Sequence, residues 1–195
     1  MAACNTLLRG INPNCDATRK PGGLNKNLYF GLLSDLDAVT FGSGNRITGF
    51  TFKATKGFVK VIGKREKHNT AMTLEAGENF SLRNHAVNAV IYYNTAEELE
   101  ALDAIIDVEG AFIVAETNAG ELEVWGVNKG ANFMNFGLKA TSIEGGSGTA
   151  MTDSNIYTLG MTGNHENLQM IFKSTNESTL AADIAILDGE TIWPA

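Results

Sequence analysis

The chain has 195 residues, of which 44% are hydrophobic and 19% are charged, a composition typical of one globular domain, or two small ones, with a buried core. Its 21 glycines against three prolines favour many turns and a strand-rich fold, because glycine adopts the positive φ angles of tight turns. No apolar run approaches the roughly 20 residues of a membrane-spanning helix. The start of the chain also lacks the apolar stretch of a signal peptide, so we expect no membrane partner.

Charge is divided unevenly along the sequence. Residues 1–84 carry a net charge of +6 and residues 85–195 a net charge of −13, which together give the overall −7. Opposite charges on two halves of a chain can attract within one molecule or between copies, and head-to-tail contacts between copies build rings and filaments. The acidic overall balance argues against a dedicated nucleic-acid-binding protein.

Turn and strand signals alternate through the first third of the chain. Residues 1–27 are predicted to be loop-like, with strong turn signals at 12–14 and 21–23. The turn at 42–45, Gly-Ser-Gly-Asn, lies between apolar runs and predicts a hairpin. Short strands are expected at 28–30, 35–41, 47–52 and 58–62.

Residues 56–80 are predicted to form a long hairpin arm. From Lys64 to Glu78 the residues are mostly polar and alternating, with little apolar weight. Such an arm cannot be held by a core of its own, and it would gain most by adding to the sheet of a neighbouring copy.

One helix is predicted at 95–107. Thr95 is a candidate N-cap, and Glu98 three residues later completes a capping box. Apolar residues then recur at helical spacing from Leu99 to Ile106. Acidic residues cover the outer face and the first turn, where they suit the helix dipole.

The second half of the chain reads mainly as strands. They are expected at 86–93, 111–115, 122–126, 132–143, 155–161 and 168–172, with a turn at 118–120 and a final strand or turn of helix at 181–187. The sequence therefore predicts a single mainly β domain over 1–195, a β-sandwich or barrel with one flanking α-helix and a long β-hairpin arm.

Nothing in the sequence forms a catalytic or metal-binding pattern. The stretch 57–64 superficially resembles a phosphate-binding loop, but it has five residues between its glycines where four are required, and Arg65 stands where Ser or Thr should bind magnesium. Cys4 and Cys15 fit free thiols better than a disulfide in a reducing cytoplasm, with the disulfide left open, and their spacing does not suit zinc. The three histidines are isolated from one another. We therefore expect no enzyme, no cofactor and no metal, with a ligand-binding or catalytic site scattered across loops as the alternative.

Six cations lie between residues 53 and 67, against Glu66 alone. Contact with another subunit is the favoured interpretation. A solvated face and a phosphate-backbone surface remain open, the latter because Phe52 and Phe58 interleave with the cations. The candidate subunit-contact residues are the cations and the acidic residues of the predicted helix: Lys53, Lys56, Lys60, Lys64, Arg65, Lys67, Glu97, Glu98, Glu100 and Asp103.

The order of these features resembles structural proteins of tailed phages, especially phages that infect Bacteroidetes. The likeness covers most of the chain. It rests on a Cys-bearing start followed by Gly22-Gly23-Leu24, a basic strand-rich middle, the short helix with the hairpin at 112–126 and the run at 128–133, and the segment at 148–159. Within that group the chain is most similar to tail tube proteins.

This resemblance implies a β-sandwich or barrel whose copies form rings, commonly of six, that stack into a tube conducting DNA. It would place 56–78 in the arm or inner sheet and 95–106 as the flanking helix. It implies a non-enzymatic virion protein, assembled in the host cytoplasm, with itself and other virion proteins as partners. DNA would be non-specific cargo in an acidic lumen. A capsid-decorating or head-associated protein is the alternative.

Overall fold

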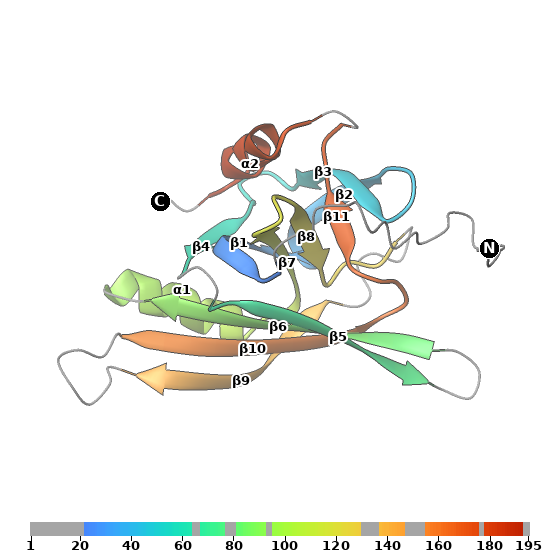
Figure 1. The fold of residues 1–195 in the computed structure, drawn as a ribbon. Helices are drawn as coiled ribbons and strands as arrows, with labels where there is room; N and C mark the ends of the chain where they lie inside the picture. The colour runs from blue at the N-terminus through green and yellow to red at the C-terminus, as the bar shows by residue number, and fades with distance from the viewer. Residues whose placement is uncertain are drawn as a thin grey trace.

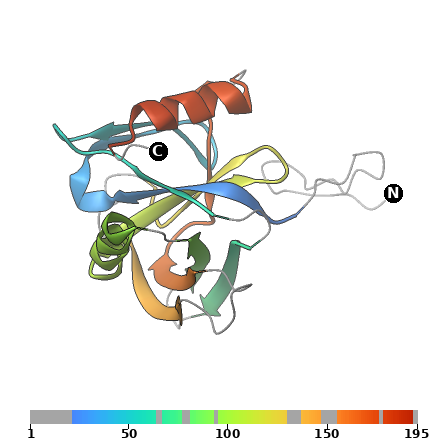
Figure 2. The same ribbon diagram turned by 90° about the vertical axis from the view of Figure 1, so that its left-hand side faces the viewer.

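The structure is a computed structural model, and it describes residues 22–63, 67–76, 81–92, 95–129, 137–146, 155–175 and 178–192. These residues form a mainly β fold with one mixed sheet of 11 strands and two short α-helices, as Figures 1 and 2 show. The mainly β prediction is confirmed. The strands are β1 (Leu24–Leu32), β2 (Leu36–Phe41), β3 (Arg46–Phe52), β4 (Val59–Ile62), β5 (Asn69–Ala76), β6 (Ser81–Tyr92), β7 (Glu109–Thr117), β8 (Leu122–Trp125), β9 (Leu138–Gly146), β10 (Ile156–His165) and β11 (Met170–Phe172). A 3-10 turn, η1 (Leu33–Asp35), joins β1 to β2, and the helices are α1 (Ala96–Ile106) and α2 (Leu180–Gly189).

Strand β7 lies at the centre of the fold. It pairs antiparallel with β1 on one side and with β8 on the other, and from Ala111 to Thr117 every residue is buried. Alternate side chains of a strand point to opposite faces. Phe112 and Val114 therefore enter one core, while Ile113 and Ala115 enter the other.

Two cores lie on the two faces of this central layer. One contains Tyr29, Phe112 and Phe172 and is closed by β2, β3 and α2. The other contains Leu28, Ile113 and Trp125 and is closed by α1 and by β9, β10 and β6, while β5 pairs with the outer edge of β6. We call the four strands β9, β10, β6 and β5 the lower layer, which is at the bottom of Figure 1.

The lower layer is antiparallel throughout. Its order is β9-β10-β6-β5. Within the described residues, the sheet links this layer to the central strands at the start of β9 alone, where Leu138 and Lys139 pair with β7. The hairpins β5–β6 and β9–β10 extend to opposite sides of the body in Figure 1.

The turns and the helix follow their local signals. Gly44 and Gly120 have φ angles of +72° and +77° in the two expected turns, which only glycine adopts without strain. Helix α1 confirms the helix predicted at 95–107. Helix α2 resolves the ambiguity at 181–187, and it begins where the Thr179 hydroxyl accepts a hydrogen bond from the Ala182 amide.

Some predicted boundaries need correction. Within the segment expected to be a loop, β1 already begins at Leu24, because Glu116 of β7 accepts hydrogen bonds from Asn25 and Asn27 and holds this polar start in the sheet. The predicted arm at 56–80 is divided in two: β4 pairs with β1 inside the body, while β5 pairs with β6. The strand expected at 132–143 is β9, which begins later, at Leu138.

Several predictions concern residues outside the described ranges. They are residues 1–21 of the predicted loop-like segment, residues 64–66 and 77–80 of the predicted arm, and residues 131–136. No helix in the described part of the chain is long and apolar enough to cross a membrane.

Candidate functional site

Among the residues that the structure describes, the lower layer has a free strand edge at each end. In this part of the chain β5 pairs with β6 alone, and all of its residues except Thr70 are exposed. Strand β9 pairs with β10 along its length but with β7 only at its first two residues, and residues 141–145 are exposed. An unpaired edge presents a row of backbone N–H and C=O groups that can pair with another strand.

Large apolar side chains are exposed on both free edges. Leu74 and Met72 on β5 are 64% and 37% exposed, and Ile143 on β9 is 41% exposed. Met72 lies opposite buried His85, and Ile143 lies opposite buried Leu159. All three side chains are therefore on the core-facing side of the layer, at places the body of the molecule leaves uncovered.

The opposite face of the lower layer is polar and carries little charge. Asn88 donates a side-chain hydrogen bond to Asn69 at 2.8 Å, and Asn84 donates one to Asn164 at 2.9 Å. The register places small and polar residues on much of this face, namely Thr73, Ala86, Ser142, Thr158, Gly160 and Thr162, together with the larger side chains of Leu82, Val90, Tyr92 and Ile156. The charged residues that the register places on it are Glu75, Glu144 and Lys139. We call this surface the polar face.

Three of the predicted contact cations have partners within the chain. The Lys53 ammonium donates to the Ser34 carbonyl at 2.6 Å, and the Lys56 ammonium lies 3.5 Å from the Asp35 carboxylate. Lys60 pairs with Asp188 at 2.7 Å. The basic half thus meets the acidic half inside one molecule at Lys60, as the charge split allows.

Tyr29 joins this pair. Its buried hydroxyl donates to Asp188 at 2.8 Å, and the Lys60 ammonium lies 5.4 Å from the centre of its ring. Desolvation acts to raise the pKa of Asp188, but the hydrogen bonds from Lys60 and Tyr29 outweigh it and lower that pKa. Burial, followed by the hydrogen bond to Asp188, raises the pKa of the Tyr29 hydroxyl. The group ties β1, β4 and α2 together.

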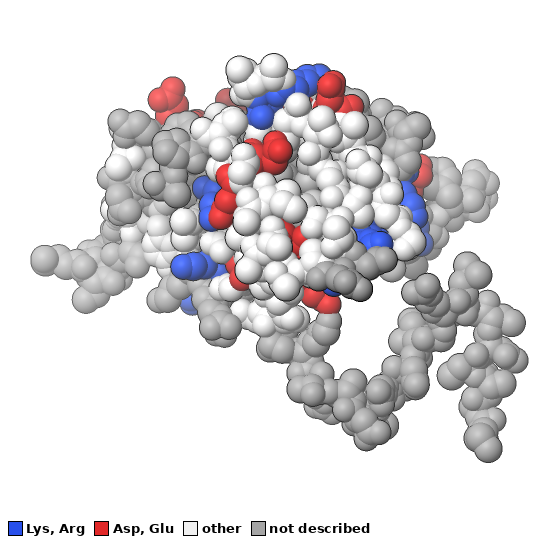
Figure 3. Space-filling model, turned by 90° about the horizontal axis from the view of Figure 1, so that it is seen from above, with Lys and Arg blue, Asp and Glu red and all other residues white. Residues whose placement is uncertain are grey.

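The other predicted contact residues are exposed or outside the described part. Lys67, Glu100 and Asp103 are exposed. Lys64 and Arg65 are outside the described ranges, as are the side chains of Glu97 and Glu98. Figure 3 shows cations and acidic residues interspersed on the face viewed from above, so the division of charge in the sequence is not a division on this surface.

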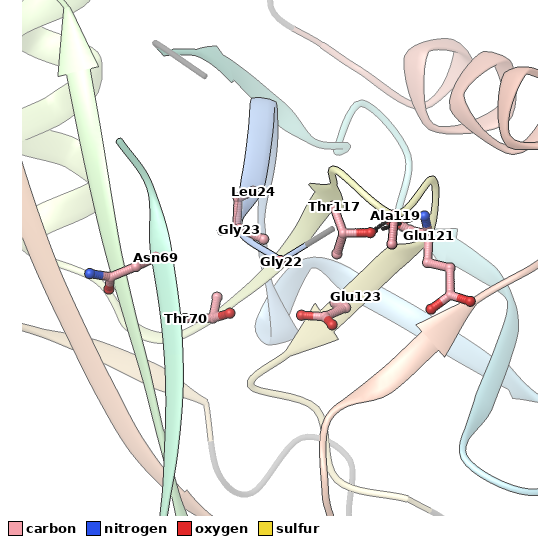
Figure 4. A pocket seen from close by; sticks show the side chains of 9 residues that line it. All are labelled: Gly22, Gly23, Leu24, Asn69, Thr70, Thr117, Ala119, Glu121 and Glu123. Atoms are coloured by element: carbon pink, nitrogen blue, oxygen red, sulfur yellow. Dashed lines mark hydrogen bonds between the residues drawn. The ribbon is translucent and has the colours of Figure 1, made fainter. Parts of the chain in front are cut away.

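A polar cleft of about 460 Å³ lies where β1 and β5 begin beside the β7–β8 hairpin (Figure 4). Its lining includes Glu121, Glu123 and Thr70. Burial raises the pKa of Glu123, while a hydrogen bond from the Trp125 indole opposes that shift. No nucleophile–base pair lines this cleft in the described residues, which also contain no group of three or more potential metal ligands.

Two histidines that are isolated in the sequence meet in the structure. His85 of β6 and His165 of β10 are fully buried, and their rings stack with centroids 4.4 Å apart. Burial lowers the pKa of His85 to about 4. Burial, together with the neighbouring His85, lowers the pKa of His165 to about 3. Eighty residues separate the two in sequence, so no spacing pattern could have revealed the pair.

No family model, curated protein or solved structure matches this chain.

Proposed function

We propose that this chain is a non-enzymatic tail tube subunit of a phage virion, which assembles by joining its sheet to those of neighbouring copies. The observation that carries the proposal is the lower layer, which has a free edge at each end and exposed apolar side chains on both edges. The assembly would form in the host cytoplasm, and the virion would be its final location.

The direction of the strands suits a ring. Strands alternate across β9-β10-β6-β5, so β9 and β5 run in opposite directions. If β5 of one copy lies along β9 of the next, the new pair is antiparallel like every other pair in the layer. This contact joins two different edges, and such a head-to-tail contact closes into a ring when the rotation between copies allows it.

The exposed apolar residues fit the same contact. Met72 and Leu74 face the core side of the layer, so a neighbour joined at β5 would place its own layer and body beside them. Burial of apolar surface contributes about 25 cal/mol per Å², and the backbone hydrogen bonds of the new strand pair fix its direction.

A closed ring of lower layers would surround a channel lined by the polar face. Amide and hydroxyl side chains at Asn88, Thr158 and Asn164 lack the positive charge that gives proteins most of their affinity for phosphate backbones. DNA would pass such a surface without being held. This supports a conduit for DNA as non-specific cargo.

The predicted contact charges also come together in this arrangement. Antiparallel pairing places the start of β5, next to Lys67, at the end of a neighbouring β9. Helix α1, which contacts β9, exposes Glu100 and Asp103. Cations of one copy would thus approach acidic residues of the next, with other virion proteins bound elsewhere on the ring.

The test is assembly of the purified full chain, followed by electron microscopy and by sedimentation over a range of concentrations. We expect rings or stacked rings for the parent. The double variant Leu74→Lys with Ile143→Lys should remain folded and monomeric, because charge on the free edges opposes strand addition. Leu168→Lys is the matched control, since Leu168 is an exposed apolar residue outside the four strands of the lower layer.

A parent that stays monomeric at high concentration and is absent from tails would overturn the proposal. Binding to empty capsids without ring formation would instead support the head-associated alternative. A charge exchange tests the contact itself: Glu100→Lys should weaken assembly, and adding Lys67→Glu should restore it. Rings unaffected by either change would remove this ion pair from the proposal while leaving strand addition intact.

A further inference from the structure

The histidine pair lies where the chain passes between the lower layer and the central strands. Segment 126–137 leads from β8 to β9, and segment 166–169 leads from β10 to β11. His85 contacts both connections. The Gly126 amide donates to His85 Nδ1 at 3.4 Å, and His85 Nε2 lies 3.0 Å from the Asn167 carbonyl oxygen.

These two partners define the neutral form of His85. Because Nδ1 accepts a hydrogen bond from the Gly126 amide, it cannot carry a proton itself, so Nε2 must be the protonated nitrogen that donates to the Asn167 carbonyl. Protonation of Nδ1 would turn the Gly126 contact into two facing N–H groups. A charged His85 would therefore lose its bond to the end of β8.

His165 has no compensation for a charge. Neither of its ring nitrogens has a hydrogen-bond partner in the described part of the molecule, and its ring stacks at 26° on that of His85. A buried cation without a partner is strongly disfavoured, and two stacked cations would also repel each other.

The surrounding charged groups do not neutralise the pair. Arg83 lies opposite His165 on β6, and its guanidinium donates to the carbonyl oxygens of Ser81 and Glu166. Glu166 is exposed. The Lys129 ammonium donates a hydrogen bond to the Gly44 carbonyl oxygen, and the Glu123 carboxylate accepts one from the indole of Trp125. The uncharged neighbours are Met72 opposite His85, the edge of Trp125, and Asn128, which accepts from the Glu166 amide.

We propose that the stacked His85–His165 pair is a proton-operated joint, which holds the lower layer against β8 when both rings are neutral and opens when they take up protons. Opening separates the layer from the 125–129 segment and hydrates Trp125, while the strand pairs within each layer persist. The joint rests on the described geometry and is independent of the proposed assembly.

The lowered pKa values of both rings determine that acid opens the joint. An open joint binds protons near pH 6.5, whereas the closed joint binds them only near pH 4 and pH 3. The open form therefore gains protons first, and the closed form loses stability as pH falls from about 6.5 toward 3.

The experiment is an acid titration of the full chain in a Trp193→Phe background, which leaves Trp125 as the only tryptophan. We expect Trp125 emission to shift to longer wavelength at a higher pH than the one at which far-ultraviolet circular dichroism is lost. His165→Phe keeps the ring stack and loses no hydrogen bond, so it should lower the midpoint of the Trp125 transition by at least about half a pH unit. His165→Leu serves as the second variant if Phe does not fit.

His68→Gln is the matched control. His68 is also buried, and burial lowers its pKa, but it lies at the start of β5 and accepts a hydrogen bond from the Val90 amide, which Gln can also do. This variant should leave the Trp125 midpoint unchanged. The joint is overturned if the emission and circular dichroism changes coincide in the parent, if the His165 variants leave the midpoint unmoved, or if His68→Gln lowers it equally.

Discussion

The central strands and the lower layer differ in how fully their backbone groups and apolar side chains find partners within one molecule. Strand β7 has a partner strand on both sides and a core on both faces, so its hydrogen bonds and apolar side chains are satisfied within one molecule. The lower layer has one covered face, one polar face and, in the part of the chain that the structure describes, two unpaired edges. The difference indicates that the first region is self-sufficient within one molecule, whereas the second leaves backbone groups of its edge strands without a strand partner among the described residues.

This contrast predicts the largest loss of stability at Phe112. Its ring is fully buried and packs against Phe50 and Phe58. Phe112→Ala should lower the free energy of unfolding by about 3–5 kcal/mol, measured by urea denaturation. Ile186→Ala, on the exposed side of α2, is the control and should change it by less than about 0.5 kcal/mol. Equal effects would mean that the central layer is not the stabilising core.

A smaller loss is expected at Glu116. This buried carboxylate of β7 accepts hydrogen bonds of 2.7 Å from both Asn25 and Asn27 and so holds the start of β1. Glu116→Gln places an amide N–H₂ against one of these donors and should cost about 1.5–3 kcal/mol. Glu109→Gln, at an exposed position of the same strand, is the control. A stability equal to that of the parent would show that Glu116 does not hold the start of β1 in place.

Asp188 should give a modest effect that depends on pH. The pKa of Asp188 is lowered in the folded protein. Its contribution to the free energy of unfolding is therefore fully present above the ordinary carboxyl pKa of 3.8, and it is lost as the pH falls through the pKa of the folded state. Asp188→Asn should therefore lower the free energy of unfolding by less than about 1 kcal/mol at pH 7, because the carboxylate is partly exposed. The difference from the parent should shrink below about pH 4. A difference constant with pH, measured by denaturation at several pH values, would contradict the ion pair.

The smallest effect on the monomer is expected at Leu74, in the open region. Its side chain is mostly exposed, so Leu74→Ser should change the free energy of unfolding by less than about 0.5 kcal/mol. The same variant should reduce the sedimentation of assembled material. A large loss of monomer stability would show that β5 belongs to the self-sufficient part of the molecule.

Local signals were enough to predict the elements but not how they meet. The capping pattern at Thr95 located α1, and glycine-containing turns located the β2–β3 and β7–β8 hairpins. Helix α2 stayed ambiguous because the stretch from Leu180 to Leu187 is apolar around most of its circumference and shows no clear period.

The candidate site depended on contacts that are distant in sequence. Pairing of β4 with β1 rather than within an arm is decided by the shared core around Leu28 and Phe30, which no local pattern encodes. The free edge of β5 was anticipated from its polar alternation, but that of β9 was not, since it depends on where β7 stops pairing. The meeting of His85 and His165 likewise follows from the β6–β10 register alone.

The lower layer has an even number of strands, and this bears on how many copies could close a ring. Because the layer contributes an even count of alternating strands, a barrel built from whole copies has no seam of parallel strands, whatever its number of subunits. The circumference of such a barrel would then depend on how strongly the lower layer of each copy is curved. The irregularity in the β9–β10 register beside Gly160 is a place where such bending is built in, because an extra residue in one strand increases local curvature. In the tube that we propose, removing that residue from β9 should therefore alter the diameter while leaving the way copies join unchanged.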